Sequence, residues 1–269
     1  MGAGFVDIHS HVIPSADDGA RDREEGLELC RRAAAQGTRL LYGTPHAQTA
    51  SSWHPLTEER YQQALANYKL MKDDCARFGL ELRLGFELTP GGILIGAIED
   101  YLLEGTSAVL VEVPGPWLSC SDALGQTREQ SAEIRAAGFE VILAHPERCA
   151  EVQGEPALLL PFIAEGALVC FNADSILGGH DAAAEQCAWH LLDLGVGDFV
   201  ASDAHSLGRP SRLRVAFEAI AARYGSRRAL GLVDGSRLSR LPTRAAAAPV
   251  TRSLPRQVRP RRASPVQNK

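Results

Sequence analysis

Short apolar runs alternate with longer stretches of helical character along most of the chain. The apolar runs predict strands at 4–9, 39–44, 81–88, 107–113, 139–145, 167–172 and 197–203. The stretches between and after them predict helices at 23–36, 57–78, 91–103, 121–137, 155–165, 181–194 and 210–225. Glycine directly follows several of these helices, which suits the residue after a helix C-terminus. The pattern therefore indicates an alternation of strand and helix.

The strands are apolar at nearly every position, which is typical of a parallel sheet covered by helices. Seven strand–helix units favour one barrel related to the (β/α)₈ type, with an open doubly wound sheet as the structural alternative. The first predicted strand is not followed by a glycine-rich loop that could cradle a phosphate, so a dinucleotide site is not expected.

Composition is that of a cytoplasmic globular protein. The chain has 269 residues, of which 45% are hydrophobic. No apolar run approaches the roughly 18 to 20 residues that span a bilayer, and the start of the chain does not resemble a secretory signal. The six cysteines form no CxxC pair, which indicates free thiols in a reducing compartment.

Charge is distributed unevenly, and this divides the chain in two. Residues 235–269 carry eight arginines, one lysine and no acidic residue, whereas the rest holds 19 basic and 33 acidic residues. This segment also contains five prolines and few large apolar side chains, a composition that favours disorder. We therefore predict one domain at 1–234 and a disordered tail at 235–269. The tail is either an inert extension or a contact for an acidic surface, such as anionic lipid or an acidic protein. We expect no binding to nucleic acid.

Candidate metal ligands stand at the ends of six predicted strands and in one adjoining loop. In a barrel of parallel strands, these ends face one shared opening. The candidates are His9, His11, Asp18 with its neighbour Asp17, His46, Glu87, Glu112, His145, Asp203 and His205. The remaining strand ends in Asn172, which is a weaker ligand. The other histidines, His54, His180 and His190, do not share this placement; we expect His190 to be a packing residue and the other two to lie near the rim.

The ligand types predict a site for more than one metal ion. Imidazole and carboxylate ligands without cysteine suit Mn²⁺, Fe²⁺ or Zn²⁺. Nine ligands fit two or three ions, and a carboxylate such as that of Glu87 can bridge two of them. Any one of these side chains could instead be an ordinary polar group at a strand end or in an ion pair. Their joint placement favours the metal site.

Two arginines lie in the same loops. Arg148 follows His145 by three residues, and Arg209 follows His205 by four. Guanidinium groups match the oxygens of a phosphate dianion, so both residues are candidate phosphate ligands. The alternative is that they form salt bridges to the acidic residues of the site.

The motifs DIHSH, DDG, TPH, GFE, VEVP, AHPER and ASDAHSLGRP resemble those of the polymerase-and-histidinol-phosphatase (PHP) superfamily. Within it, the chain is similar to the manganese-dependent tyrosine-protein phosphatases of bacterial capsule and exopolysaccharide loci, the CpsB/YwqE type. The resemblance runs from about residue 5 to about residue 230. It implies a distorted (β/α)₇ barrel of the PHP type that holds three metal ions, with Mn²⁺ expected and Fe²⁺, Zn²⁺ or Co²⁺ as alternatives.

The resemblance also implies roles for residues. One metal would be held by His9, His11, Glu87 and Asp203, a second by Glu87, Glu112 and His145, and a third by Asp18, His46 and His205. Arg148 and Arg209 would bind the substrate phosphate, and Asp203 or His205 would assist proton transfer as a metal-activated water attacks phosphorus. The implied substrate is a tyrosine-phosphorylated, membrane-associated autokinase that regulates polysaccharide synthesis.

One departure from the family concerns a loop. The segment between His205 and Arg209 is one residue shorter than the family form HNLDGR, which leaves the reach of Arg209 open. None of the six cysteines has an arginine six positions later, so the Cys-x₅-Arg mechanism of other tyrosine phosphatases is absent.

Four other functions compete with this interpretation. They are a small-molecule phosphatase of the histidinol-phosphate type, a polymerase-linked nuclease, a metal amidohydrolase and a non-catalytic scaffold in polysaccharide assembly. An amidohydrolase would commonly place a lysine where Glu112 stands. A scaffold would be expected to lose ligands, and no polymerase region accompanies a nuclease.

Overall fold

Two parallel sheets form the centre of the computed structural model, which describes residues 4–48, 55–90, 97–115 and 122–241. The first sheet has the order β1-β2-β4 and the second β3-β5-β6-β7-β8-β9. The strands are β1 (Phe5–Asp7), β2 (Thr38–Gly43), β3 (His46–Ala47), β4 (Glu81–Leu84), β5 (Glu87–Leu88), β6 (Ala108–Glu112), β7 (Glu140–Ala144), β8 (Leu168–Asn172) and β9 (Phe199–Ala201). All paired strands are parallel, so the predicted parallel α/β architecture is confirmed.

One predicted strand is divided between the two sheets, and another is followed by a short strand of the other sheet. The predicted strand 81–88 breaks at Gly85 into β4 and β5, whereas the predicted strand 39–44 is β2, and β3 begins beyond its end, after Pro45. Pro45 has no N–H to donate, which interrupts the ladder at this point. At the other edges, β1 and β9 are linked beyond their ends by a bridge between Ser10 and Ala204. The result is one mixed α/β domain whose two sheets are not a single continuous ladder.

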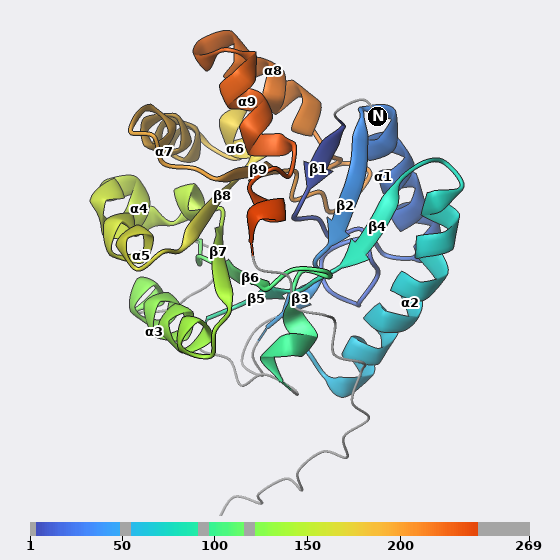
Figure 1. Cartoon of the computed structure of the whole chain (residues 1–269). Coiled ribbons are helices and arrows are strands. Elements are labelled where there is room, and N and C mark those ends of the chain that lie inside the picture. The colour runs from blue at the N-terminus through green and yellow to red at the C-terminus, as the bar shows by residue number, and fades with distance from the viewer. Residues whose placement is uncertain (1–3, 49–54, 91–96, 116–121, 242–269) are drawn as a thin grey trace, which may run out of the picture.

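Helices lie around the outside of the strands (Figure 1). They are α1 (Arg23–Ala35), α2 (Glu58–Ala76), α3 (Ala123–Ala136), α4 (Ala150–Gly154), α5 (Leu160–Ala164), α6 (Ala173–Ile176), α7 (Ala182–Asp193), α8 (Leu213–Tyr224) and α9 (Ser226–Val233). Short 3₁₀ helices are η1 (Ile98–Tyr101), η2 (Pro146–Arg148), η3 (Pro156–Leu159) and η4 (Leu238–Arg240). Aspartate or threonine side chains cap the N-termini of α1, α2, α3 and α7. None of the described helices is both long and apolar enough to cross a bilayer.

Two helix predictions need correction, and one longer helix was missed. The predicted helix 91–103 is only a 3₁₀ turn at Ile98–Tyr101 where it is described, and its residues 91–96 lie outside the described chain. The predicted helix 155–165 is divided into η3 and α5, each of which has a proline in its first turn. The helix α9 was not predicted; it begins after Gly225, whose φ of 87° ends α8.

The strands are apolar throughout because both of their faces are buried. On β6, Val109 and Val111 belong to the larger core under the helices, whereas Leu110 belongs to a second core. On β7, Val141 is likewise in the larger core and Ile142 in the second one. This alternation follows from side chains that point to opposite faces of a strand. It explains why the sequence shows continuous apolar runs.

The described chain continues past the predicted domain boundary at residue 234. Leu238 in η4 is 6% exposed and belongs to the second core, and Leu241 packs against that core. This segment is drawn in red near the middle of the strands in Figure 1. Residues 242–269 lie outside the described residues, so the predicted disorder of the tail stays a prediction there.

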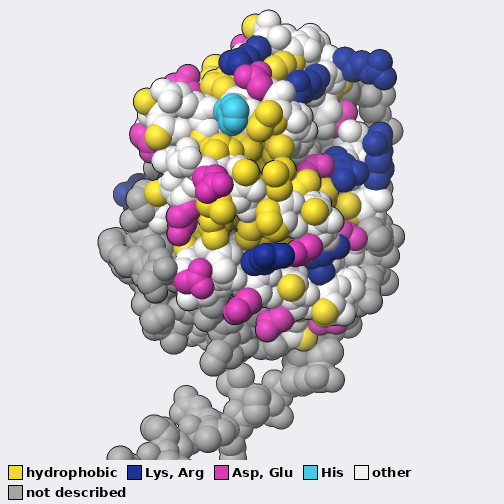
Figure 2. Space-filling model, turned by 90° about the vertical axis from the view of Figure 1, so that its left-hand side faces the viewer, with side chains coloured by type: hydrophobic (Ala, Val, Ile, Leu, Met, Phe, Trp, Pro, Cys, Tyr) yellow, Lys and Arg dark blue, Asp and Glu magenta, His cyan; other side chains and the backbone are white. Residues whose placement is uncertain are grey.

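One outer face of the domain is rich in apolar side chains. Figure 2 shows them gathered on the side of the molecule that carries α4, α5 and α7. Leu160 in α5 and Leu194 at the end of α7 are 58% and 64% exposed. The leucines of these helices are therefore not all used in packing against the sheets.

Candidate functional site

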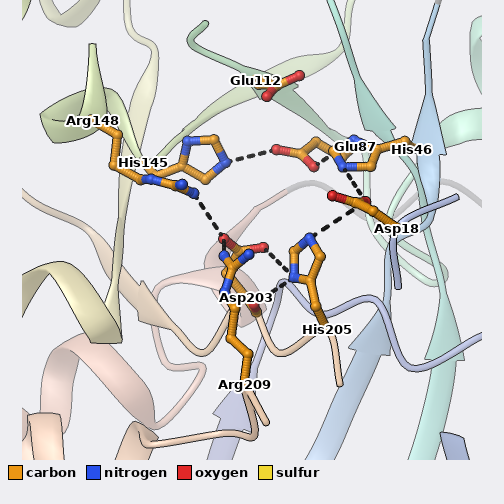
Figure 3. Close-up of a pocket in the computed structure, with 9 residues that line it drawn as sticks. All are labelled: Asp18, His46, Glu87, Glu112, His145, Arg148, Asp203, His205 and Arg209. Atoms are coloured by element: carbon orange, nitrogen blue, oxygen red, sulfur yellow. Dashed lines mark hydrogen bonds and ion pairs between the residues drawn. The ribbon is translucent and has the colours of Figure 1, made fainter. Parts of the chain in front are cut away.

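One pocket gathers side chains from strand ends and adjoining loops that lie far apart in the sequence. Its lining includes both candidate arginines and seven of the nine candidate metal ligands (Figure 3). The lining residues are Asp18, His46, Glu87, Glu112, His145, Arg148, Asp203, His205 and Arg209. The two remaining candidates, His9 and His11, lie behind them in contact with Glu87 and Asp203. The structure thus brings all nine predicted ligands together.

Glu87, the first residue of β5, is the centre of the cluster. Its Oε2 lies 3.2 Å from Nε2 of His9, 3.3 Å from Nε2 of His11 and 3.1 Å from Nδ1 of His46. Its other oxygen, Oε1, lies 2.9 Å from Nε2 of His145. The two carboxylate oxygens therefore face different groups of imidazoles, which is the arrangement that a bridging carboxylate requires.

Asp203 closes the cluster from the opposite side. Its Oδ1 lies 3.4 Å from Nε2 of His9, 3.3 Å from Nε2 of His11 and 3.5 Å from Nδ1 of His205. His9 and His11, two positions apart after β1, direct both Nε2 atoms to the same place, and these atoms lie 3.2 Å apart. Residues two positions apart on an extended chain point to the same side, so the HxH spacing brings both imidazoles into the cluster.

The loop after β1 distinguishes Asp18 from Asp17. Asp18 reaches into the pocket, with Oδ1 3.3 Å from Nε2 of His46 and 3.6 Å from Nε2 of His205. The buried Asp17 instead accepts the backbone N–H of His46 at 3.0 Å, and its Oδ2 lies 3.7 Å from Nδ1 of His11. Asp17 therefore orients the loop and a histidine, while Asp18 presents a carboxylate to the pocket.

Charge balance in the pocket keeps the carboxylates ionised. Burial alone would raise the pKa of Glu87, but the charges of His9 and His46 hold it well below its ordinary value. Burial alone would also raise the pKa of Asp203, but nearby charges, chiefly that of Arg209, hold it well below its ordinary value. Burial lowers the pKa of His205 to about 3, and the charge of His11 acts in the same direction. His205 is thus neutral near pH 7, as a metal-binding imidazole must be.

The donor set fits divalent metal ions. Four groups of side chains, which together contain all nine predicted ligands, have potential ligand atoms within 4.8 Å of one another. Oε2 of Glu87 and Oδ1 of Asp203 are buried and accept no hydrogen bond from the described residues. Buried carboxylate oxygens without such donors are costly unless a cation meets them. Nitrogen and oxygen ligands without sulfur suit Mn²⁺, Fe²⁺ or Zn²⁺.

Both candidate arginines reach the edge of this cluster. Nη1 of Arg148, the last residue of η2, lies 3.3 Å from Oδ2 of Asp203, and Nη2 of Arg209 contacts the same oxygen. The short segment between His205 and Arg209 does not keep Arg209 from reaching Asp203. His205 and Arg209 close a tight turn in which the N–H of His205 donates to the carbonyl of Arg209 at 3.0 Å. Figure 3 shows the two guanidinium groups beside Asp203.

Two residues have supporting roles that were not predicted from the sequence. The hydroxyl of Thr89 donates to Oε2 of Glu112 at 3.0 Å, and Asn172 donates to Asp203 at 2.7 Å. Thr89 lies two residues beyond Glu87, and a hydroxyl so near a predicted ligand was the available signal. For Asn172, the signal was its place at the end of a strand in the ring of candidate ligands.

The three remaining histidines have different environments. His190 is exposed on α7, so its prediction as a packing residue is wrong. His54 lies outside the described residues. Nε2 of His180 is buried without a hydrogen bond to the described residues. Burial, followed by the charges of Arg148 and Arg209, lowers the pKa of His180 to about 4.

Comparison with known proteins gives relatives over most of the chain. The tyrosine-protein phosphatase YwqE of Bacillus subtilis is 28% identical over 211 residues, which cover 76% of this chain and 78% of YwqE. The tyrosine-protein phosphatase CpsB of Streptococcus pneumoniae is 25% identical over 243 residues, which cover 87% of this chain and 97% of CpsB.

A solved structure from work on these same two proteins superimposes with a TM-score of 0.66 at 26% identity, covering 84% of this chain and 90% of the other. YwqE and CpsB are described there as metal-dependent tyrosine phosphatases. The family model for capsular polysaccharide synthesis, CpsB/CapC, matches residues 5–234, which include the nine predicted ligands and both arginines. The chain therefore belongs to the CpsB/CapC family.

Proposed function

We propose that the protein is a metal-dependent phosphomonoesterase that hydrolyses phosphotyrosine in proteins. The observation that carries this proposal is the convergence of Arg148 and Arg209 on Asp203, at the edge of a cluster of imidazoles and carboxylates. A metal cluster alone does not need two guanidinium groups, but a substrate with a phosphate dianion does. Membership in the CpsB/CapC family and similarity to proteins named tyrosine-protein phosphatases support the same reaction.

The metal ligands are proposed in three groups. His9, His11, Glu87 and Asp203 hold the first ion, Glu87, Glu112 and His145 the second, and Asp18, His46 and His205 the third. We propose Mn²⁺ for two or three positions, with Fe²⁺, Zn²⁺ and Co²⁺ as alternatives of similar ligand preference. Bound divalent ions would supply an activated water and positive charge for the phosphoryl oxygens.

The catalytic roles follow from the position of each side chain. Arg148 and Arg209 bind the non-bridging phosphate oxygens and meet the charge that grows on them during displacement. Asp203, between the imidazoles and the arginines, and His205 beside it are proposed to assist the transfer of the proton that the attacking water releases. The four side chains therefore combine substrate binding with proton transfer.

The biological setting is proposed from the family. The substrate is a tyrosine-phosphorylated protein, which we propose to be a membrane-associated autokinase that regulates synthesis of capsular or extracellular polysaccharide. We place the enzyme in the cytoplasm, and we assign the contact with acidic surfaces to the basic tail. We further propose that the ring of strands is a distorted (β/α)₇ barrel, with the bridge between Ser10 and Ala204 as its closing contact.

The alternatives differ in substrate or in the absence of catalysis. A small-molecule phosphatase of the histidinol-phosphate type would use the same metal and phosphate ligands. A non-catalytic scaffold is disfavoured because all nine predicted ligands and both arginines are retained and lie together. An amidohydrolase is disfavoured because Glu112 occupies the end of β6, where that class commonly has a lysine.

The test compares two substrates on one preparation of the full chain. The protein is stripped with chelator, reloaded with Mn²⁺, and assayed on a phosphotyrosine peptide and on histidinol phosphate. We expect the larger kcat/KM on the peptide and loss of activity when chelator is present. A wide preference for histidinol phosphate would refute the tyrosine phosphatase assignment. If the protein is inactive on both substrates after separate reloading with Mn²⁺, Fe²⁺, Zn²⁺ and Co²⁺, the non-catalytic scaffold is favoured.

A further inference from the structure

Asn172 is held at both ends of its side chain. It is the last residue of β8 and is 2% exposed. Its Oδ1 accepts the backbone N–H of Asp174 at 2.8 Å, which caps the short helix α6. Because this end must be the acceptor, the other end is the amide nitrogen, and Nδ2 donates to Oδ2 of Asp203 at 2.7 Å. The direction of the amide is thus fixed by its partners.

The two oxygens of Asp203 have separate surroundings. Oδ1 faces the rings of His9, His11 and His205 at 3.3 to 3.5 Å and accepts no hydrogen bond from the described residues. Oδ2 faces donors only: Nδ2 of Asn172, Nη1 of Arg148 and Nη2 of Arg209. One oxygen is therefore turned toward the candidate metal ligands, and the other toward the phosphate side of the pocket.

We propose that Asn172 is a positioning residue that fixes the carboxylate of Asp203, so that Oδ1 stays directed at the metal ligands while the arginines bind the substrate. The part that concerns the arginines rests on the proposed function. Once Arg148 and Arg209 turn to a phosphate dianion, Oδ2 loses two of its three donors. Asn172 remains, because its other end caps α6 and its backbone N–H donates to the buried Glu147 at 3.0 Å.

The backbone conformation of Asp203 is a second reason why its carboxylate needs a hydrogen bond from a neighbouring residue. Its φ is 50°, in the left-handed region that residues with a side chain adopt only rarely. Hydrogen bonds from neighbours that orient a metal ligand typically contribute about 10- to 100-fold to metal affinity or activity. A direct bond of 2.7 Å from a fully buried amide is placed to make such a contribution.

Two substitutions separate this role from the capping of α6. Asn172→Ser keeps a good capping oxygen but is too short to reach Asp203. Asn172→Asp keeps both the size and the capping oxygen but offers no amide donor. Asp181→Asn, at the N-cap of α7, is the matched control for a change of capping residue. Each variant is stripped of metal and titrated with Mn²⁺ by calorimetry, and its melting temperature without metal is recorded.

We expect both Asn172 variants to bind Mn²⁺ about 10- to 100-fold more weakly. The melting temperature of the metal-free variants should be close to that of the metal-free wild type. Their kcat should fall by a larger factor than that by which KM changes. Wild-type affinity in Asn172→Ser would overturn the proposal, even if Asn172→Asp is impaired, because the added charge alone would then explain the loss. Unfolding of both variants would overturn it too, since the residue would be structural.

Metal affinity also separates this inference from the proposed function. It is measured without any substrate, so it does not depend on which ester the protein hydrolyses. If the wild type fails on phosphotyrosine peptide while Asn172→Ser still loses Mn²⁺ affinity, the reaction is assigned wrongly and the positioning role stands. If the wild type is active and the variant binds metal normally, only the positioning role fails.

Discussion

Loss of either pocket arginine should separate phosphate recognition from metal binding. Arg148 and Arg209 contact Oδ2 of Asp203, the oxygen turned away from the imidazoles, so neither belongs to the predicted metal ligands. Replacing one by Ala leaves Asn172 as a donor to Asp203. We therefore expect Arg148→Ala and Arg209→Ala to keep their metal content and lose transition-state stabilisation.

The size of the loss follows from burial. The side chain of Arg148 is 15% exposed and that of Arg209 28%, so water screens their charges only in part. Removing one fixed donor to a developing oxyanion costs about 2–4 kcal/mol, or roughly 30- to 1,000-fold in kcat/KM. Because Arg148 is the less exposed, its replacement should lie nearer the upper limit. Lysine at either position keeps the charge without the planar fork and should give an intermediate rate.

The assay measures kcat/KM on a phosphotyrosine peptide, inhibition by inorganic phosphate, and metal content by mass spectrometry. Both alanine variants should lose rate and phosphate inhibition together while metal content stays at the wild-type level. Arg32→Ala is the control, because Arg32 forms an exposed pair with Glu28 on α1 and surface pairs contribute under about 1 kcal/mol. Normal kcat/KM in both pocket variants would show that the arginines are structural.

Four further results are expected. The double change of His9 and His11 to Ala should abolish hydrolysis and lower metal content with a native circular dichroism spectrum; wild-type stimulation by Mn²⁺ would refute their role as ligands. Deleting residues 242–269 should leave the rate on a small aryl phosphate within about threefold. Leu238→Ala, by contrast, should lower the free energy of unfolding by about 2–4 kcal/mol because this side chain is buried, and an unchanged melting temperature would refute that. His180→Gln should make the free energy of unfolding less sensitive to acid. The pKa of His180 is about 4 in the folded protein, against an ordinary 6.5, so between these pH values the unfolded chain binds more protons than the folded one. The free energy of unfolding of the wild type therefore falls as the pH falls through this window. With allowance for partial exposure, the wild type should lose about 1 kcal/mol more than the variant between pH 7 and pH 5, and equal losses would contradict the assigned shift.

The sequence allowed the candidate ligands to be grouped because most of them stand at or just beyond the end of an apolar strand. A buried parallel strand and the polar residue at its carboxyl end are both local features, visible in stretches such as VILAH, which ends in His145, and FVASD, which ends in Asp203. Parallel strands then bring these ends to one side of the sheet without further information. For this reason, distant residues such as His46 and Glu112 can be grouped from the sequence alone.

Elements whose form depends on breaks in the backbone were harder to predict. The division of strand 81–88 at Gly85 depends on close packing, since a side chain there would meet Leu103 at 2.6 Å. The helix at 155–165 was predicted from the pattern of apolar and polar residues, but prolines divide it. Leu238 lies just inside a segment whose average composition indicates disorder. A single leucine that reaches a core does not change such an average.

The direction of the ligands is the part of the site that no residue pattern encodes. Among the described residues, the non-glycine residues with positive φ are Ala16, His145 and Asp203, and two of these are candidate metal ligands. Glycine would suit such φ values of 36° at His145 and 50° at Asp203, but glycine offers no ligand. Their backbone N–H groups donate to carbonyls of Cys170 and His9 at 2.8 and 2.9 Å, which holds both residues in place beyond the strand ends. The conformation thus turns each side chain into the cluster at a cost that the neighbouring strands offset, as expected where function rather than stability selects the residue.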